Sequence, residues 1–325
     1  MRGQNLREVK VADLHKAKKR LSGYLNPTPV TSSELLNIFL GGKVYMKLEN
    51  LQPACSYKIR GAINKCLSLK EEFGDDVSII TASSGNHGLA CAYASKLLDM
   101  KSKVYVPVST PQIKKDNIRA LGATLVEIGE TYDSSFISAC EEAENSAELN
   151  YVHPVSDVDV VAAQGTIGLE ILDQIEDVEQ VIIPLGGGGL SSGIAFAIKN
   201  LKPGVNIISV MPESSDVYVK SREAGKLVTI ENPHSIADAV VRRCGEEYLF
   251  PYIEKYVDEI RTVSEDSMME AIKAAAVYGK VVLEAAGAMP LAAVLEDKTL
   301  LNKKTVLICS GGNIDEKLFK ECLNK

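Results

Sequence analysis

The sequence lacks the features of membrane proteins, exported proteins and nucleic-acid-binding proteins. No run of apolar residues approaches the length of about 18 that a membrane-spanning helix needs. The charged N-terminal segment has no apolar core of a signal peptide. The formal net charge is -7, and charges of both signs are mixed along the chain, so no basic surface for a nucleic acid or an anionic membrane is indicated. We therefore expect a cytoplasmic protein that binds a small molecule.

Disulfide frameworks, structural zinc sites and disorder are not indicated either. The seven cysteines are an odd number without a C-x-x-C pair, and none of the four histidines has metal-ligand spacing. There is no low-complexity tract and no internal repeat, and 46% of the 325 residues are hydrophobic. This composition is sufficient for a folded protein of two domains with free thiols.

The sequence has a regular alternation of strand and helix patterns. Strands are expected at residues 44–48, 77–81, 103–106, 124–128, 181–184, 206–210 and 305–309. Helices are expected at residues 88–98, 111–121, 134–149, 160–174, 190–200 and 265–278. Such an alternation requires parallel sheets covered by helices, so the fold class is α/β. The alternation forms two series that divide near residue 150, which predicts two parallel-sheet domains with the ligand in the cleft between them.

A glycine-rich turn follows one of the expected strands. The chain runs from this strand through Gly186, Gly187, Gly188 and Gly189 into a helix that begins near Leu190. Consecutive backbone N–H groups and the helix N-terminus can hold a phosphate without a cationic side chain. The dinucleotide and P-loop patterns both fail at this turn. It predicts a phosphate-monoester site, with a tight strand-to-helix turn as the alternative.

A lysine among apolar neighbours lies at the expected entry to another helix. It is Lys58, in the segment LQPACSYKIRGA at residues 51–62. Most lysines are solvated surface charges. Together with a phosphate site, however, a partly desolvated lysine points to pyridoxal phosphate, because such a lysine readily forms an imine with an aldehyde.

Four motifs carry a resemblance to a known family. They are SYKIRGA at residues 56–62, SSGNHG at 83–88, GGGGL at 186–190 and CSGGN at 309–313. Over essentially the whole chain, their order and spacing resemble the fold-type II pyridoxal-phosphate enzymes, specifically the serine/threonine dehydratase (threonine ammonia-lyase) and serine racemase group. The resemblance implies a tryptophan synthase β-like fold, with a large cofactor-binding domain at residues 1–50 and 150–325 and a small substrate-side domain at residues 51–149. It also implies a homodimer, and no C-terminal regulatory domain is expected because the chain ends soon after residue 313.

The resemblance also assigns site residues. Lys58 is expected to bind the cofactor covalently and to act as the general base, Asn86 to contact its phenolic oxygen, and Ser310 to face its pyridine nitrogen. The phosphate is expected at Gly186, Gly187, Gly188, Gly189 and Leu190. The substrate is expected at Ser83, Ser84, Gly85, Asn86 and His87, with His87 as a pocket wall or backbone support. A neutral serine at the pyridine nitrogen gives a weaker electron sink than an aspartate, which favours β-elimination and proton transfer over transamination.

The implied activity is dehydration and deamination of a small β-hydroxy amino acid, such as L-serine or L-threonine, to a 2-keto acid and ammonia. Ser84 keeps amino-acid racemisation open, since racemases of the group carry serine here and simple dehydratases tend to carry alanine. In that case the Ser84 hydroxyl returns the proton on the opposite face, whereas in the alternative Ser83 or Ser84 caps a helix or binds the carboxylate. A β-replacement synthase and a non-catalytic phosphate-binding module are weaker alternatives.

The sequence departs from the family pattern at three places. Cys55 replaces a glycine and is interpreted as a packing residue, with a reactive thiol as the alternative. Met211 stands where racemases have an acidic residue that helps to bind a cation. Glu213 and Asp216 lie close by and could substitute, but two solvated carboxylates in a loop are favoured, so no required metal is expected. Arg242 and Arg243 replace small or neutral residues. Arg242 is expected either to bind a second carboxylate of the substrate, which keeps an acidic hydroxy-amino acid open, or to be a solvated surface side chain.

Overall fold

The chain leaves one structural unit and later returns to it. The structure, a computed structural model, describes residues 3–325. Unit 1 contains the chain up to Leu25 and Tyr57–Ala163, and unit 2 contains Asn26–Ser56 and Gln164–Lys325. These limits differ from the expected ones at residues 50 and 150, chiefly because the N-terminal segment groups with unit 1.

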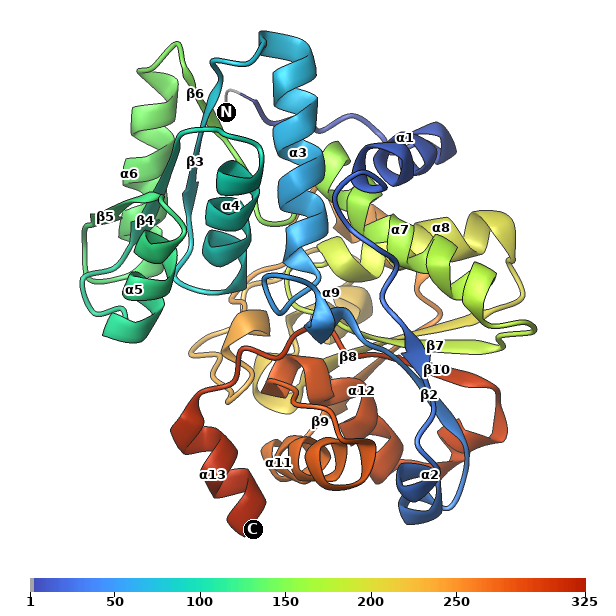
Figure 1. Cartoon of the computed structure of the whole chain (residues 1–325). Coiled ribbons are helices and arrows are strands. Elements are labelled where there is room, and N and C mark those ends of the chain that lie inside the picture. Colours follow the sequence, from blue (N-terminus) through green and yellow to red (C-terminus); the bar gives the residue numbers. More distant parts are fainter. Residues whose placement is uncertain (1–2) are drawn as a thin grey trace. The chain divides into compact units, whose positions relative to one another are not determined.

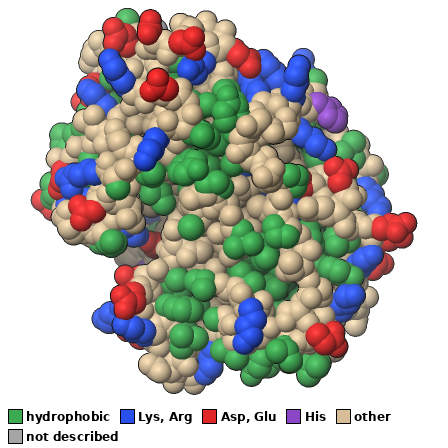
Figure 2. All heavy atoms as spheres, viewed as in Figure 1, with side chains coloured by type: hydrophobic (Ala, Val, Ile, Leu, Met, Phe, Trp, Pro, Cys, Tyr) green, Lys and Arg blue, Asp and Glu red, His purple; other side chains and the backbone are tan. Residues whose placement is uncertain are grey.

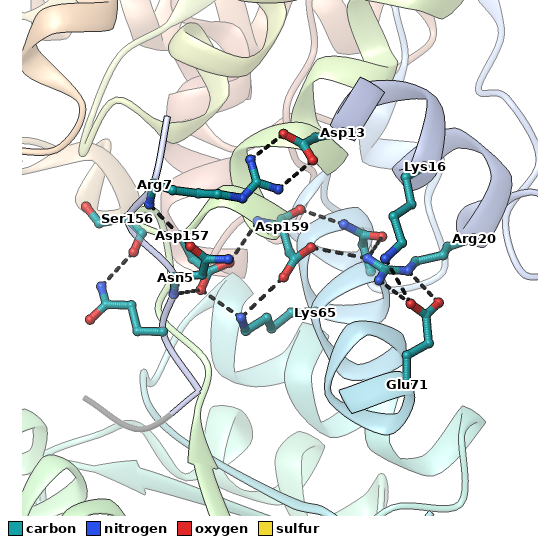
Figure 3. A network of polar contacts seen from close by, with 12 residues as sticks. Asn5, Arg7, Asp13, Lys16, Arg20, Lys65, Glu71, Ser156, Asp157 and Asp159 are labelled. Atoms are coloured by element: carbon teal, nitrogen blue, oxygen red, sulfur yellow. Dashed lines mark hydrogen bonds and ion pairs between the residues drawn. The ribbon is translucent and has the colours of Figure 1, made fainter. Parts of the chain in front are cut away.

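A polar network holds the N-terminal segment in unit 1 (Figure 3). The Asn5 N–H donates to the Asp157 carboxylate at 2.9 Å, and the Gln4 amide donates to the Ser156 carbonyl oxygen at 2.6 Å. The same carboxylate pairs with the Lys65 ammonium at 2.8 Å, and both charged groups are buried. The segment is therefore anchored by partners 152 residues further along the chain.

Unit 1 is built on a parallel sheet in the order β5-β4-β3-β6. Its strands are β3 (Ser78–Ala82), β4 (Ser102–Val106), β5 (Thr124–Glu127) and β6 (Leu149–Tyr151). Its helices are α1 (Val11–Leu21), α3 (Lys58–Phe73), α4 (Asn86–Leu97), α5 (Gln112–Ala120) and α6 (Tyr132–Glu144). Val104 and Val106 of β4 pack with α4 and α5, whereas Tyr105 packs with α6 (Figure 1). Successive strand residues thus point to opposite faces, and each face is covered by helices.

Unit 2 is built on a sheet in the order β1-β2-β10-β7-β8-β9, in which only the β1–β2 pair is antiparallel. Its strands are β1 (Val30–Thr31), β2 (Val44–Lys47), β7 (Gln180–Pro184), β8 (Asn206–Pro212), β9 (Glu259–Val263) and β10 (Thr305–Ile308). Its helices are α2 (Glu34–Leu40), α8 (Gly189–Leu201), α9 (Val217–Ala224), α10 (Phe250–Tyr256), α11 (Glu265–Ala274), α12 (Ala285–Glu296) and α13 (Glu316–Asn324). Helix α7 (Val158–Gln174) contains the boundary between the units. Helix α12 is buried over most of its length and contributes to the large core of this unit.

The expected strands and helices are all present, with end residues that differ slightly. The helix expected at residues 134–149 is too long, because α6 ends at Glu144 and the chain then enters β6. The helix expected at residues 265–278 ends at Ala274 and continues as a π-helical turn, Ala275–Gly279. Three strands were missed: β1 has two residues, β6 lies in the sequence read as helix, and β9 has a largely polar pattern.

Figure 2 shows lysine and arginine side chains beside aspartate and glutamate side chains mainly around the rim of the visible face, with hydrophobic and uncharged atoms nearer its centre. Every helix within residues 3–325 falls short of the combined length and hydrophobicity that crossing a bilayer requires.

Candidate active site

Lys58 is the first residue of α3 in unit 1. Its Nζ donates to the Pro154 carbonyl oxygen at 2.8 Å and lies 5.2 Å from the centre of the Tyr57 ring. A cation at a helix N-terminus gains nothing from the helix dipole, which favours negative charge at that end. Helix stability therefore does not explain why a lysine occupies this position.

The motif at residues 83–88 forms the turn between β3 and α4. The N-cap of α4 is Gly85, and no side chain caps this helix. The Ser83 hydroxyl instead accepts from the Gly85 N–H at 3.2 Å, within the turn. A Cβ at Gly88 would lie 2.1 Å from the Ser83 carbonyl oxygen, so the glycine is required by close backbone packing. The alternative in which Ser83 or Ser84 is the helix cap is thus wrong, and Ser84 stays half-buried in a turn that exposes helix N–H groups.

His87 supports this turn from inside unit 1. Its Nε2 lies 2.9 Å from the Val152 carbonyl oxygen. Burial, with a further contribution from the charge of Lys58, lowers the pKa of His87 to about 3. The ring is therefore neutral at pH 7, and Nε2 carries the proton because a carbonyl oxygen can only accept. The influence of the Lys58 charge also means that the lysine motif and the 83–88 turn lie close together.

The glycine-rich turn lies between β7 and α8 in unit 2 and is completely buried. Gly188 has a φ of 95°, and a Cβ at Gly186 would lie 2.8 Å from the Val240 Cα. The Tyr218 hydroxyl donates to the Gly187 carbonyl oxygen at 3.2 Å and accepts from the Glu246 N–H at 3.0 Å. Burial raises the pKa of Tyr218, so this hydroxyl stays protonated. Tyr218 fixes a peptide of the turn, and no spacing rule in the sequence indicated it.

This turn has the properties that a phosphate group requires. It leads into the N-terminus of a helix of 13 residues, where N–H groups have no partner within the helix. In the first turn of that helix, the Ser192 hydroxyl is buried without a hydrogen-bond partner among the described residues. Gly186 and Gly188 let the backbone of the turn pack closely against Val240 and Tyr218. The residues therefore fit a phosphate monoester such as that of pyridoxal phosphate.

Ser310 lies in a second turn of unit 2, directly after β10. The Gly312 N–H donates to the Cys55 carbonyl oxygen at 2.9 Å, and Gly311 pairs with Ser56 in an isolated β-bridge. The Ser310 side chain is buried within this arrangement. Strands β10 and β7 are parallel neighbours, so this turn and the glycine-rich turn lie at the same edge of the sheet. A phosphate site and a neutral hydroxyl thus share the edge where ligands bind in α/β proteins.

Two predictions outside these turns have different outcomes. Cys55 is exposed and has a φ of 52°, so its interpretation as a packing residue is wrong, because the tight turn after Gln52 directs the side chain outward. Arg242 is half-buried, and its Nη1 donates to the Val241 carbonyl oxygen at 3.0 Å. Its charge contributes to the pKa of Tyr218, which places Arg242 near the residue that braces the glycine-rich turn. Its expected contact with a substrate stays a prediction.

The two acidic residues near Met211 have different surroundings. Glu213 is exposed, and the Asp216 carboxylate pairs with Lys220 at 2.9 Å. Within residues 3–325, no group of three or more His, Cys, Asp and Glu side chains is placed to hold a metal ion.

Comparison with known proteins identifies the family. The profile of the family described as pyridoxal-phosphate dependent enzymes matches residues 21–311. The chain belongs to this family. It is an enzyme with pyridoxal phosphate as its cofactor, and the fold is that of the fold-type II enzymes, as predicted.

Individual relatives of this pyridoxal-phosphate dependent enzyme carry two kinds of name. An L-threonine ammonia-lyase from Thermotoga maritima is 36% identical over 98% of this chain and 79% of its own length. An L-threo-3-hydroxyaspartate ammonia-lyase from Saccharomyces cerevisiae is 36% identical over 94% of each chain. The solved structure of maize serine racemase is 30% identical, covers 98% of each chain and superposes with a TM-score of 0.90.

Proposed function

We propose that this enzyme dehydrates and deaminates a small β-hydroxy amino acid, L-serine or L-threonine, to a 2-keto acid and ammonia. The relatives named as ammonia-lyases support this reaction class. The observation that carries the proposal is Ser310, a neutral hydroxyl at the same sheet edge as the phosphate turn. A neutral partner for the pyridine nitrogen favours elimination over transamination.

The proposal assigns the cofactor residues as follows. Lys58 holds the cofactor covalently, and Asn86 and Ser310 contact its ring. The phosphate is held by Gly186, Gly187, Gly188, Gly189 and Leu190. Unit 2 accordingly corresponds to the cofactor-binding domain and unit 1 to the substrate-side domain.

The chain's own residues then perform the proton transfers. When bound, pyridoxal phosphate withdraws electrons from the substrate Cα and makes its C–H bond acidic. The N–H groups at the start of α4, with Ser83 and Ser84, bind the substrate carboxylate, where the helix dipole favours an anion. Once the substrate amine has displaced it from the cofactor, the free Lys58 Nζ would remove the Cα proton as general base and pass that proton to the departing hydroxyl group, which leaves as water. The Pro154 carbonyl oxygen orients Nζ, and neutral His87 holds the turn without exchanging protons.

Racemisation is the second candidate, and the geometry of Ser84 supports it. Because Gly85 caps α4, the Ser84 hydroxyl is not used as a helix cap and is available to a substrate. If it donates a proton to Cα on the face opposite Lys58, the product is the mirror-image amino acid. The serine racemase relative agrees with this candidate.

A substrate with a second carboxylate is a variant of the main proposal. Arg242 is half-buried near Tyr218, and the Saccharomyces relative is named for a hydroxyaspartate. A guanidinium group binds a carboxylate through paired N–H donors. We also propose that the enzyme is a cytoplasmic homodimer.

The test is proton NMR of the holoenzyme in heavy water with L-serine, L-threonine or L-threo-3-hydroxyaspartate, followed by chiral analysis of the recovered amino acid. Formation of a 2-keto acid supports the proposal, and the preferred substrate reports on Arg242. Recovery of α-deuterated D-serine that disappears in Ser84→Ala supports racemisation. Borohydride reduction followed by peptide mapping should find the cofactor on Lys58. If the cofactor is bound there and no keto acid forms from any of the three substrates, the proposed dehydration is wrong.

A further inference from the structure

Gln164 presents a buried amide group that the fold does not satisfy. Its side chain is 1% exposed, and neither Oε1 nor Nε2 has a hydrogen-bond partner among the described residues. Exchanging the two atoms would not help, because both are unpaired. A buried amide without partners costs free energy, and native proteins rarely retain one unless a water molecule or ligand binds it.

The topology of unit 2 places Gln164 beside the start of α8. Helix α7 leads into β7, and α8 follows it, so the N-termini of both helices lie at the carboxyl edge of the sheet. Helices α7 and α8 lie side by side (Figure 1). Gly168 of α7 packs against α8, since a Cβ there would lie 3.1 Å from Ala197 Cβ and from the Ile194 carbonyl oxygen. Gln164 lies one turn earlier on the same face of α7. It therefore faces the first turn of α8, next to the glycine-rich turn.

A second unsatisfied group lies in that first turn. The Ser192 side chain is 0% exposed, and its hydroxyl has no partner among the described residues. Its neighbour Ser191 differs, because its hydroxyl donates to the Pro184 carbonyl oxygen at 3.2 Å and accepts from Ser209 at 3.1 Å. Of two adjacent buried serines, only the one without a structural bond is open to a ligand.

We propose that Gln164 and Ser192 bind the cofactor phosphate in addition to the glycine-rich turn. Gln164 Nε2 and Ser192 Oγ donate to phosphate oxygens, and Gln164 Oε1 accepts from a buried water that itself donates to the phosphate. A phosphate monoester is an acceptor with several oxygens, and hydrogen bonds to a charged acceptor are stronger than bonds between neutral groups. The inference rests on the cofactor of the family and not on the proposed reaction.

The test compares pyridoxal phosphate with pyridoxal, which lacks the phosphate. Apoenzyme is titrated with each compound, and the dissociation constants are measured from absorbance. Gln164→Leu should weaken binding of pyridoxal phosphate by ~10-fold or more and leave pyridoxal binding unchanged, because one bond to a charged group is lost. Ser192→Ala should act in the same direction. Ser191→Ala is the matched control and should not change the ratio of the two constants.

Thermal unfolding of the apoenzyme gives a second measurement. Gln164→Leu should keep or raise the unfolding midpoint of the apoenzyme, since it removes an unsatisfied buried group. The increase in this midpoint on addition of pyridoxal phosphate should be smaller than in the wild type. Three results for Gln164→Leu would each overturn the inference. They are an equal loss of affinity for pyridoxal phosphate and pyridoxal, an unchanged ratio of the two dissociation constants, and a lower unfolding midpoint of the apoenzyme. A wild-type enzyme that binds the cofactor tightly but acts on no hydroxy-amino acid would overturn the proposed function alone.

Discussion

Replacing Lys65 by methionine is expected to destabilise unit 1 by about 3–5 kcal/mol at pH 7, because it leaves a buried carboxylate without its main counter-charge. Lys65 Nζ lies 2.8 Å from Asp157 Oδ2, and the two side chains are 3% and 1% exposed. Asp159 is a second, longer partner at 3.4 Å. Methionine keeps most of the packing volume of the lysine stem, so the loss reports on charge.

The loss should depend on pH in a defined direction. Burial raises the pKa of Asp157 above its ordinary value, and the charge of Lys65 opposes this increase. Without Lys65 the pKa is raised further, so the folded variant binds more protons than the unfolded chain between the ordinary and the raised pKa. Stability of the variant therefore increases as the pH falls through this range, and the deficit relative to wild type is smaller at pH 5 than at pH 8.

The assay is urea-induced unfolding followed by circular dichroism at pH 5, 7 and 8. Lys320→Met is the matched control, because Lys320 is 68% exposed and pairs with Glu316 one helical turn away. This control should change stability by at most about 0.5 kcal/mol. The double change Lys65→Met with Asp157→Asn should recover most of the loss, because asparagine removes the buried charge while its amide oxygen can still accept from the Asn5 N–H. A deficit below about 1 kcal/mol in Lys65→Met at pH 7 would refute the reasoning.

Three further predictions concern single groups. Hydrogen bonding with an arginine lowers the pKa of Glu71 from 4.5 to about 2. Its contribution to stability is therefore present above pH 4.5 and is lost as the pH falls toward 2. In urea unfolding, the free energy of unfolding of Glu71→Gln should converge with that of the wild type over this range. Gly186→Ala should weaken pyridoxal phosphate binding by about tenfold in an absorbance titration, because the added Cβ would lie 2.8 Å from backbone. Gly204→Ala is the control and should leave binding unchanged, because an added Cβ there meets no atom within 4 Å. Iodoacetamide should label exposed Cys55 and spare buried Cys309, whose pKa burial raises to about 12, when the native protein is analysed by mass spectrometry.

The sequence predicted the local backbone structure around the candidate site residues. Gly186 to Gly189 and Lys58 stand in short motifs whose helix or turn follows from the residues themselves, and the structure has α8 beginning at Gly189 and α3 at Lys58. The parts that depend on distant contacts could not be predicted. Asn5 meets Asp157 across 152 residues, and Tyr218 braces Gly187 from another helix. No spacing rule reaches over such separations.

Burial was also hard to predict for single side chains. Cys55 was assigned to the interior because cysteine usually packs there, but a positive φ turns the side chain outward. Gln164 is the opposite case, since a glutamine in a helix is usually solvated and this one is buried. Both residues depend on the backbone path of their neighbours, which composition does not reveal.

The strand order of unit 2 has a consequence for synthesis on the ribosome. Strand β10 lies between β2 and β7. The β1–β2 pair is therefore joined to β7, β8 and β9 only through β10, which is the last strand of the sheet to be synthesised. Unit 1, in contrast, has all its strands by residue 151. As the chain emerges from the N-terminus, unit 1 can complete its sheet first, while β2 remains without its parallel neighbour until β10 has been made. We expect nascent chains to expose this edge of β2 until β10 has been made, and an unpaired strand edge of this kind is a site at which chaperones can prevent aggregation.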